Sequence, residues 1–443
     1  MEEPTIKVGI IELYRKVNGG FNGPYRVNNE RLLDGGFAVR AAEDCLILYD
    51  DAGNEIMRQR EIGCSPLYDA TFTLFDVTVG IQFHWQRKEE QTFQGALTLI
   101  LGEGNTLTAI NEIHLEDYLI SVISSEMSAE APLEFLKAHA IISRSWLMAA
   151  LDPARTTQET FAVTGNMDFT SVNEIICWYG RDEHALFDVC ADDHCQRYQG
   201  ITRFMSGSAR KAVEATRGVF LTHNDKICDA RYHKACGGIT DTFDHTWEDT
   251  PIPYLSSIPD APAFYEPVHT EEQATQWLLS SPDAYCNTTD ENLLTQILPF
   301  LDQGTKDFFR WRVKYRREEL EEILRMKSGI DFGDLESLSV VERGPSGRII
   351  RLKVKGSKKT IVVGKELEIR RWLSRSHLYS SAFIVTAEGG SPAAPDHFIL
   401  HGAGWGHGVG LCQIGAAVMA TKGFTAEEIL KHYFRGTELQ KRY

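Results

Sequence analysis

The 443-residue sequence lacks several features that would place it in a simple class of protein. It has no run of about 18 or more apolar residues, so no segment is expected to cross a membrane. It has no excess of basic residues, because 46 Lys and Arg stand against 62 Asp and Glu, which gives a formal net charge of −16. This balance argues against a chain that binds nucleic acid as a whole, although it leaves room for a local basic groove.

The first residues lack the pattern of a secretory signal. Met1-Glu2-Glu3-Pro4 is acidic, whereas a signal peptide begins with basic residues and continues into an apolar core. We therefore expect either a trimmed form of a longer protein or a protein that stays inside the cell. Repeats of fixed period and low-complexity tracts are also missing.

Cysteine is present, but its pattern is not that of a small protein stabilised by several disulfide bonds. The chain is long and its nine cysteines are an odd number. We expect several of them to be plain buried thiols, which is the commonest state of a free cysteine.

The patterns along the chain predict an α+β fold with four parts. Residues 5–110 read as short strands separated by glycine turns, and residues 111–264 begin with helical segments before returning to strands. Residues 265–375 combine helical segments with a hairpin and read as an inserted α+β subdomain, while residues 376–443 hold a glycine-rich strand followed by helix. The expected architecture is a mixed, strand-rich core around a buried helix that carries candidate catalytic residues.

That buried helix is predicted at Pro132–Leu151. It is apolar on nearly every face, and Pro132 suits a first turn, with Ser128 as a candidate cap. Arg144 lies on the same stripe as Leu136 and Ala140. Because a guanidinium cannot lose its charge, Arg144 needs a charged partner or a polar cavity, which makes it a candidate functional residue.

Glu126 is a second candidate, since it lies between two apolar helical runs. A carboxyl group in apolar surroundings has a raised pKa and can donate a proton near neutrality. Arg144 could then orient this carboxyl group or hold a substrate anion. The alternative is an ordinary first-turn or capping Glu, and the local sequence by itself favours that alternative.

A glycine-rich run, Gly402–Gly410, lies near the C-terminus and contains Trp405 and His407. Where glycine alternates with other residues, one face of a strand carries no side chains, so another backbone or a ligand can approach it closely. The spacing fits neither the dinucleotide fingerprint nor the phosphate-binding loop of nucleotide hydrolases. A sugar-binding wall is the more natural functional interpretation, and tight packing against a core helix is the alternative.

Two thiols and two imidazoles fall within twelve residues, at His184, Cys190, His194 and Cys195. Together they form a plausible tetrahedral zinc set. A site filled by four protein ligands would be structural, because no position is left for a catalytic water. The alternative is a reduced or disulfide-bonded Cys190–Cys195 pair with exposed histidines.

A further strand-like segment, Ala230–Gly238, ends in a glycine turn and contains Tyr232, His233 and Cys236. Cys236 could pair with Cys286 or Cys228, or stay free, and the sequence does not choose among these states.

The order of these motifs resembles the SpoIID/LytB family, which is named for the stage II sporulation protein D and the amidase enhancer. The matching residues are Leu115–Leu119 with Ser125-Glu126-Met127; Leu133 with Lys137-Ala138 and Arg144; Asp188-Val189-Cys190 with His194-Cys195-Gln196; Tyr232-His233 with Cys236-Gly237-Gly238; Gly404–Gly410 with Gln413 and Gly415-Ala416; and Ile429–Tyr433 with Gly436-Thr437. The resemblance spans most of residues 5–443.

The resemblance implies a peptidoglycan lytic transglycosylase. Such an enzyme cuts between N-acetylmuramic acid and N-acetylglucosamine without water and leaves a 1,6-anhydro sugar. It prefers glycan strands from which an amidase has already removed the stem peptides. A cell-wall amidase is therefore an expected partner beside the glycan itself, and the cell envelope is the expected location.

The resemblance also assigns residues. The catalytic acid matches Glu126, and residues needed for activity match Arg144 and Tyr433. A structural zinc ion matches the neighbourhood of the His/Cys set. Contacts with the glycan are expected from Ser125, Tyr232, His233, Trp405, His407 and Gln413.

The absence of an obvious second catalytic carboxylate agrees with this chemistry. Hydrolytic glycosidases usually need two carboxyl groups that flank the bond, whereas a lytic transglycosylase can work with one. Glu126 would first protonate the glycosidic oxygen and then take the proton of the sugar's own C6 hydroxyl. Arg144 would hold Glu126 or stabilise developing negative charge.

The chain departs from the family pattern in three respects. It shows no membrane anchor, Ala235-Cys236 replaces the Ser or Thr usual there, and the insertion at 265–375 is larger than a minimal family domain needs. Two other functions therefore remain in competition: a non-catalytic glycan-binding protein that stimulates a wall amidase, and a zinc hydrolase.

Overall fold

The computed structural model describes residues 2–81, 86–152, 174–178, 184–202, 207–263, 265–268, 270–299, 302–303, 305, 307–391 and 394–443. The chain forms two compact units. Unit 1 consists of Met1–Glu130, Glu183–Val219 and Lys441–Tyr443, and unit 2 of Ala131–Asp182 and Phe220–Gln440. The predicted central part includes residues 153–173, which lie outside the described residues.

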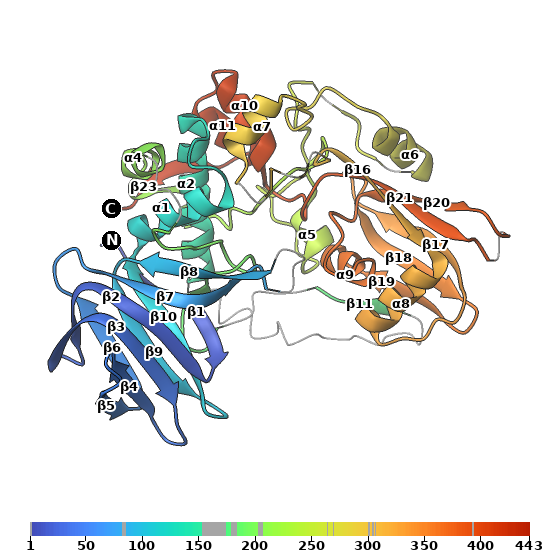
Figure 1. Ribbon diagram of the computed structural model, residues 1–443. Coiled ribbons are helices and arrows are strands. Elements are labelled where there is room, and N and C mark those ends of the chain that lie inside the picture. The colour runs from blue at the N-terminus through green and yellow to red at the C-terminus, as the bar shows by residue number, and fades with distance from the viewer. Residues whose placement is uncertain are drawn as a thin grey trace. The chain divides into compact units, whose positions relative to one another are not determined.

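Unit 1 is built on one large sheet (Figure 1). Its elements are β1 (Thr5–Tyr14), β2 (Lys16–Val27), β3 (Arg31–Ala41), β4 (Leu46–Asp50), β5 (Glu55–Gln59), β6 (Glu61–Pro66), β7 (Thr71–Val79), β8 (Arg87–Phe93), β9 (Ala96–Gly102), β10 (Thr106–His114), α1 (Leu115–Glu126), β12 (Val189–Cys190) and α4 (Gly207–Ala215). The strand order is β12-β1-β10-β9-β6-β2-β3-β4-β5, and β7 joins β2 to β8. β12 runs parallel to β1, whereas β10 pairs with β1 antiparallel.

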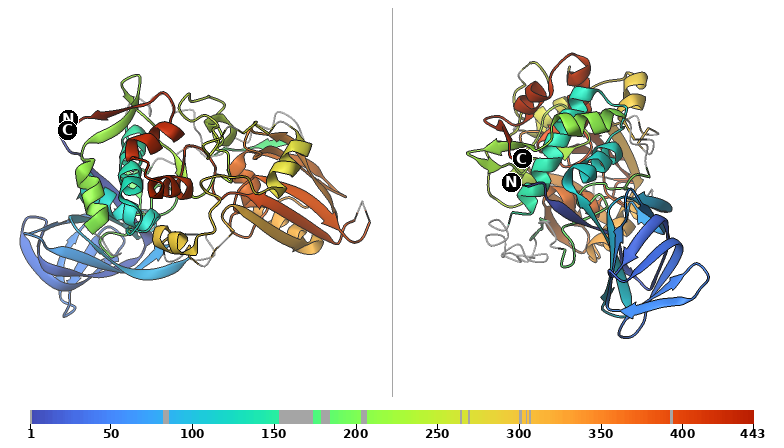
Figure 2. Two further views of the ribbon diagram at one scale, coloured as in Figure 1. Left: turned by 90° about the horizontal axis from the view of Figure 1, so that it is seen from above. Right: turned by 90° about the vertical axis from the view of Figure 1, so that its left-hand side faces the viewer.

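Helix α1 follows β10 without a loop, and its first turn is tied to both ends of the chain. Glu3 accepts the backbone N–H of Glu116 at 3.0 Å, and the Tyr443 hydroxyl donates to the Glu116 carboxylate at 2.5 Å. The two termini accordingly lie side by side in every view (Figure 2). Because ten of its twelve residues are buried, α1 presents few side chains to solvent.

The described residues of unit 2 form four small sheets and several helices (Figure 1). Its elements are α2 (Leu133–Ala150), β11 (Glu174–Ile176), β13 (Val219–His223), β14 (Lys226–Ile227), β15 (Tyr232–His233), α5 (Phe243–Thr246), α6 (Glu271–Leu279), α7 (Glu291–Ile297), β16 (Arg310–Arg316), α8 (Arg317–Ser328), β17 (Leu335–Arg343), β18 (Ile349–Gly356), β19 (Thr360–Gly364), α9 (Glu366–Trp372), β20 (Phe383–Glu388), β21 (His397–Ala403), β22 (Leu411–Cys412), α10 (Gln413–Thr421), α11 (Ala426–Tyr433) and β23 (Glu438–Lys441). The sheets have the orders β11-β19-β18-β17, β14-β13-β23, β15-β22 and β16-β21-β20.

Helix α2 is the buried helix of unit 2. Thirteen of its eighteen residues are buried, and it packs against α10, α11 and β14. The predicted burial is therefore confirmed, and the helix begins one residue later than expected. The expected cap is wrong: Pro132 occupies the N-cap position, and the Ser128 hydroxyl instead accepts the backbone N–H of Glu130.

The insertion shares its hydrophobic core with later residues. Trp311, Trp372 and Leu352 of the insertion pack with Phe383 and Leu400, and β16 pairs with β21 over seven residues. The predicted hairpin is confirmed as β17 and β18, which pair antiparallel around the turn at 344–347.

The fold is thus a strand-rich α+β fold, as predicted. Among the described residues, the helices are all too short or too polar to cross a membrane.

We predict that Tyr198→Phe lowers the stability of unit 1 by about 1–3 kcal/mol. The buried Tyr198 hydroxyl donates to Asn111 Oδ1 at 2.5 Å, and removing it leaves a buried acceptor without its donor. Urea-induced unfolding followed by fluorescence gives the difference. Tyr14→Phe is the matched control, because the Tyr14 hydroxyl contacts Thr78 in a part-buried setting. Equal effects of the two substitutions would contradict this account.

Candidate functional site

Glu126 is the last residue of α1, and its side chain is half-buried. Its Oε1 atom accepts a hydrogen bond from the backbone N–H of Arg197 at 3.0 Å. Next to it, the buried Ser125 hydroxyl has no hydrogen-bond partner among the residues that the structure describes. The end of α1 therefore has a half-buried, held carboxyl group beside a hydroxyl group that is buried in this structure.

The segment 196–199 that supplies this amide is fixed along α1. The Tyr118 hydroxyl donates to Gln196 Oε1 at 3.1 Å, and the backbone N–H of Gln199 donates to Ser121 Oγ at 3.1 Å. Arg197 itself forms an ion pair with Asp193 at 2.6 Å. The amide that holds Glu126 is thus part of an ordered segment of unit 1.

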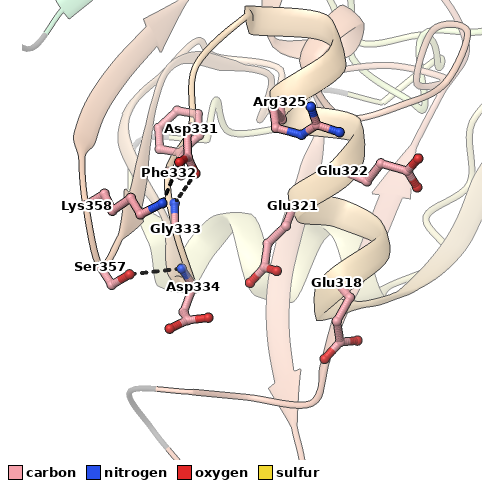
Figure 3. Close-up of a pocket in the computed structure, with 10 residues that line it drawn as sticks. All are labelled: Glu318, Glu321, Glu322, Arg325, Asp331, Phe332, Gly333, Asp334, Ser357 and Lys358. Carbon is pink, nitrogen blue, oxygen red and sulfur yellow. Dashed lines mark hydrogen bonds and ion pairs between the residues drawn. The ribbon is translucent and has the colours of Figure 1, made fainter.

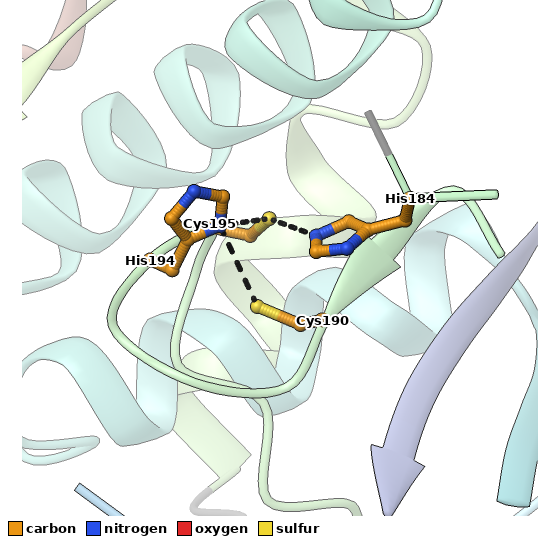
Figure 4. Close-up of side chains that lie close together, drawn as sticks. All are labelled: His184, Cys190, His194 and Cys195. Carbon is orange, nitrogen blue, oxygen red and sulfur yellow. Dashed lines mark hydrogen bonds between the residues drawn. The ribbon is translucent and has the colours of Figure 1, made fainter. Parts of the chain in front are cut away.

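The predicted His/Cys set lies immediately before that segment. The side chains of His184, Cys190, His194 and Cys195 converge on one point (Figure 4), and their ligand atoms all lie within 4.8 Å of one another. His184 Nε2 and His194 Nδ1 each lie 3.4 Å from Cys195 Sγ, and His194 Nδ1 lies 3.8 Å from Cys190 Sγ. Ligands at normal zinc distances in a tetrahedron are about 3.4–3.8 Å apart, so the donor set and its spacing fit such an ion.

The surroundings of this set favour the ligand forms. Hydrogen bonding to the Cys195 thiol, and after it to His184 and His194, holds the pKa of the Cys190 thiol far below its usual range despite its burial. The loop is anchored to the sheet through Asp192, whose carboxylate accepts the backbone N–H groups of Gly80 and Ile81 at 3.0 and 2.8 Å. No disulfide joins Cys190 and Cys195, so the disulfide-bonded alternative is not found, whereas His194 is exposed, as the alternative with a reduced pair expects.

Arg144 lies in unit 2 and is completely buried on α2. Its guanidinium carbon lies 6.0 Å from the centre of the Phe220 ring, and Nη1 lies 3.5 Å from the Ala140 carbonyl oxygen. The predicted burial of a permanent charge is therefore found.

The glycine run is packed against protein on its bare faces. A Cβ atom at Gly408 would meet the Arg348 guanidinium, and one at Gly406 would come within 3.1 Å of His233 Cβ. Trp405 pairs with Ala235 through two backbone hydrogen bonds of 2.7 and 3.1 Å. The close approach that glycine permits is thus used by Arg348 and by β15, and not by the core helix that we considered as the alternative.

The aromatic residues of this region lie together. β15, which carries Tyr232 and His233, pairs parallel with β22. His407 is half-buried and lies 5.6 Å from the His233 ring and 5.0 Å from Trp247, and Trp405 is half-buried as well. Burial lowers the pKa of His233 to about 3, so this imidazole is neutral at physiological pH. Trp405 and His407 therefore keep part of their surface available for a ligand.

Gln413 and Tyr433 are almost fully buried, with exposed fractions of 2% and 1%. The Gln413 amide lies 3.0 Å from Nε2 of His139, and the Tyr433 hydroxyl donates to Asp260 Oδ1 at 2.5 Å. In this structure both side chains contact other protein side chains. Any effect of Gln413 or Tyr433 on a bound glycan would therefore be indirect, through His139 or Asp260.

Sequence reasoning missed three features of these regions. The backbone N–H of Arg197 carries no side-chain signal, and His139 is an unremarkable residue of an apolar helix. The sequence also did not predict that Cys236, Asp260, Cys286 and Cys412 lie together in a buried group. It suggested only that Cys236 could pair with Cys286 or Cys228. The first and last of these positions are 176 residues apart, so no local spacing in the sequence predicts the group.

An open hollow of about 410 Å³ lies elsewhere in unit 2 and contains none of the expected site residues. It is lined from α8 by Glu318, Glu321, Glu322 and Arg325 and from loops by Asp331, Phe332, Gly333, Asp334, Ser357 and Lys358 (Figure 3). Half of its lining residues carry carboxylates and it is wide open to solvent, so its shape gives no reason to place the chemistry there.

Comparison with known proteins gives two family matches. Residues 103–223 match the family described as stage II sporulation protein, and residues 241–410 match a domain of unknown function, DUF8618. The first match contains α1 and the complete His/Cys set.

Curated relatives are similar over most of the chain. The stage II sporulation protein D of Bacillus amyloliquefaciens is 24% identical over 75% of this chain and 76% of its own length. An uncharacterized protein of Brachyspira hyodysenteriae is 24% identical over 78% of this chain and 72% of its own. The amidase enhancer of Bacillus subtilis is 23% identical over 72% of this chain but only 40% of its own. Together with the ordered motifs, these matches show that the chain is similar to the SpoIID/LytB family, with the family model covering residues 103–223.

Proposed function

We propose that this protein is a peptidoglycan lytic transglycosylase that cleaves the bond between N-acetylmuramic acid and N-acetylglucosamine, with Glu126 as its single acid/base residue. The observation that carries the proposal is the hydrogen bond from the backbone N–H of Arg197 to Glu126 Oε1. The similarity to sporulation protein D and to the amidase enhancer supports a role in the cell wall. Glycan strands without stem peptides are the proposed substrate.

A single carboxyl group can act twice in this reaction. Protonated Glu126 donates its proton to the glycosidic oxygen as the bond to C1 of the muramic acid breaks. The carboxylate then accepts the proton of the C6 hydroxyl while that oxygen bonds to C1, which closes the 1,6-anhydro ring. Because a carboxyl group keeps an accepting oxygen in both protonation states, the Arg197 amide can hold its orientation throughout.

Other residues take supporting roles in this proposal. Ser125 contacts the glycan beside Glu126 once its hydroxyl, which is buried in this structure, turns toward the bound strand. Trp405, His407 and Tyr232 supply an aromatic surface for sugar rings, and Arg144 stabilises negative charge that develops in the reaction. Tyr433, Gln413 and His233 support this surface from within unit 2, because their side chains are bonded to protein groups.

We propose that His184, Cys190, His194 and Cys195 bind a structural zinc ion. Four protein ligands complete a tetrahedron, so the ion would supply cross-linking rather than an activated water. Since Cys195 is two residues from Arg197, this cross-link would fix the amide that holds Glu126.

The similarity to an amidase enhancer favours a second candidate function, a non-catalytic glycan-binding protein that stimulates a cell-wall amidase. A cell-wall amidase is a proposed partner under both functions. The two differ in whether Glu126 is needed.

We predict that Glu126→Gln lowers the release of 1,6-anhydro-muramyl products from denuded glycan strands by about 100-fold or more, since general acid–base catalysis commonly contributes that much. The amide oxygen of Gln can still accept the Arg197 N–H, so the fold is retained. Mass spectrometry of the soluble products gives the rate. Glu130→Gln, at an exposed carboxylate four residues away, is the matched control and keeps full activity.

Two outcomes would count against the proposal. One is wild-type protein that releases no anhydro products. The other is a Glu126→Gln protein that is as active as wild type. If the variant still accelerates a wall amidase, the enhancer function is favoured instead.

We predict that Cys195→Ala removes one metal equivalent, lowers the melting temperature of unit 1 and reduces cleavage by about 100-fold. The reason is that a shift of about 1 Å in a catalytic group can cost that much. Elemental analysis, calorimetry and product analysis are made on the same sample. Cys45→Ala, at a half-buried thiol of the same unit, is the control. Loss of activity with an unchanged melting temperature would point to a catalytic metal and so to a zinc hydrolase.

A further inference from the structure

A second group of metal-binding side chains lies wholly inside unit 2. Cys236 follows β15, Asp260 and Cys286 lie in loops, and Cys412 ends β22. All four are at most 2% exposed, and their ligand atoms lie within 4.8 Å of one another. Four segments that are distant in sequence therefore deliver three thiols and one carboxyl group to a single buried point.

The spacing of the sulfur atoms fits shared ligation. Cys236 Sγ and Cys286 Sγ are 3.6 Å apart. Two sulfur atoms at zinc–sulfur distance in a tetrahedron are about 3.8 Å apart, whereas a disulfide requires about 2.05 Å. All three cysteines are free in the structure.

Backbone amides point at the sulfur atoms, as expected around thiolate ligands. The N–H of Cys236 donates to Cys412 Sγ at 3.3 Å, and the N–H of Gly238 donates to Cys236 Sγ at 3.3 Å. Hydrogen bonds of this kind orient ligands and stabilise their charged form in metal sites.

The carboxyl group of Asp260 is also oriented on both oxygens. The N–H of Cys286 donates to Oδ2 at 2.9 Å, and the Tyr433 hydroxyl donates to Oδ1 at 2.5 Å. Residue 415 must be glycine for this pair to fit, because a Cβ there would meet Asp260 Oδ1 and lie 2.5 Å from the Tyr433 oxygen. Tyr433 is thus a positioning residue for Asp260.

The charge of this group calls for a cation. Arg310 brings one fixed positive charge to the region and donates to the Gly237 carbonyl at 2.9 Å. A divalent ion would let the ligands ionise without leaving buried negative charge uncompensated.

We propose that Cys236, Asp260, Cys286 and Cys412 form a second structural metal site, whose ligand set of three thiolates and one carboxylate suits tetrahedral zinc. The ion cross-links β22 and the segment after β15 to the loops that carry Asp260 and Cys286. It belongs to unit 2 and is independent of the His184, Cys190, His194 and Cys195 set in unit 1. The proposal also does not depend on the transglycosylase activity, because it concerns the stability of unit 2.

The test is the metal content of the purified full-length chain, measured by elemental mass spectrometry after exhaustive dialysis. We expect two zinc ions per chain in the wild type and one in Cys286→Ala. Cys195→Ala should also retain one, and the double variant none. Cys228→Ala, which removes another buried thiol of unit 2, is the matched control and should retain two.

Further measurements keep the test decisive. If Cys286→Ala fails to fold, Asp260→Asn gives the same comparison, since Asn keeps the shape and an accepting oxygen. Cobalt substitution of Cys195→Ala should give the intense thiolate charge-transfer bands of a tetrahedral site with three sulfur ligands.

Two results would overturn the proposal. The first is a folded Cys286→Ala protein that binds as much zinc as the wild type. The second is a wild-type mass two hydrogens lower under non-reducing conditions with a Cys236–Cys286 peptide, which would make the pair a disulfide.

Discussion

The hydrogen bond from the Arg197 amide to the Glu126 carboxyl group is the contact on which the proposed chemistry depends. A flexible Glu at a helix end would sample many positions. A backbone amide fixed in an ordered segment instead restricts one oxygen and leaves the carboxyl group able to exchange a proton. This matters most for a reaction in which the same group must act first as acid and then as base.

The amide depends in turn on groups far from Glu126 in the sequence. The segment 196–199 is bonded to Tyr118 and Ser121 of α1 and to Asn111 of β10, and the His/Cys set stands directly before it. The sheet, the helix α1 and the proposed zinc ion would therefore all help to fix the orientation of the Glu126 side chain. The proposed second metal site would do comparable work in unit 2, where Tyr433 and Asp260 join the segments around the glycine run.

Local patterns predicted the parts of the fold that are local. The segment that is apolar on nearly every face forms the buried α2, and the turn residues at 344–347 connect the β17–β18 hairpin. The two histidines and two cysteines that fall within twelve residues also lie close together in the structure. The remainder depends on long-range pairing. The amide that holds Glu126 lies 71 residues away, and the sheet of the insertion takes β21 from beyond residue 375. The glycine spacing predicted that another group packs closely against the C-terminal run. It did not predict that this group is Arg348 and β15 rather than a sugar.

The central claim is that one carboxyl group cleaves glycan without water, and cleavage in ¹⁸O-labelled water tests it most directly. The account predicts muramic acid ends that carry no ¹⁸O and are lighter than the hydrolytic product by one water molecule. A reducing muramic acid end with one ¹⁸O atom at C1 would mean hydrolysis, and it would contradict the role assigned to Glu126.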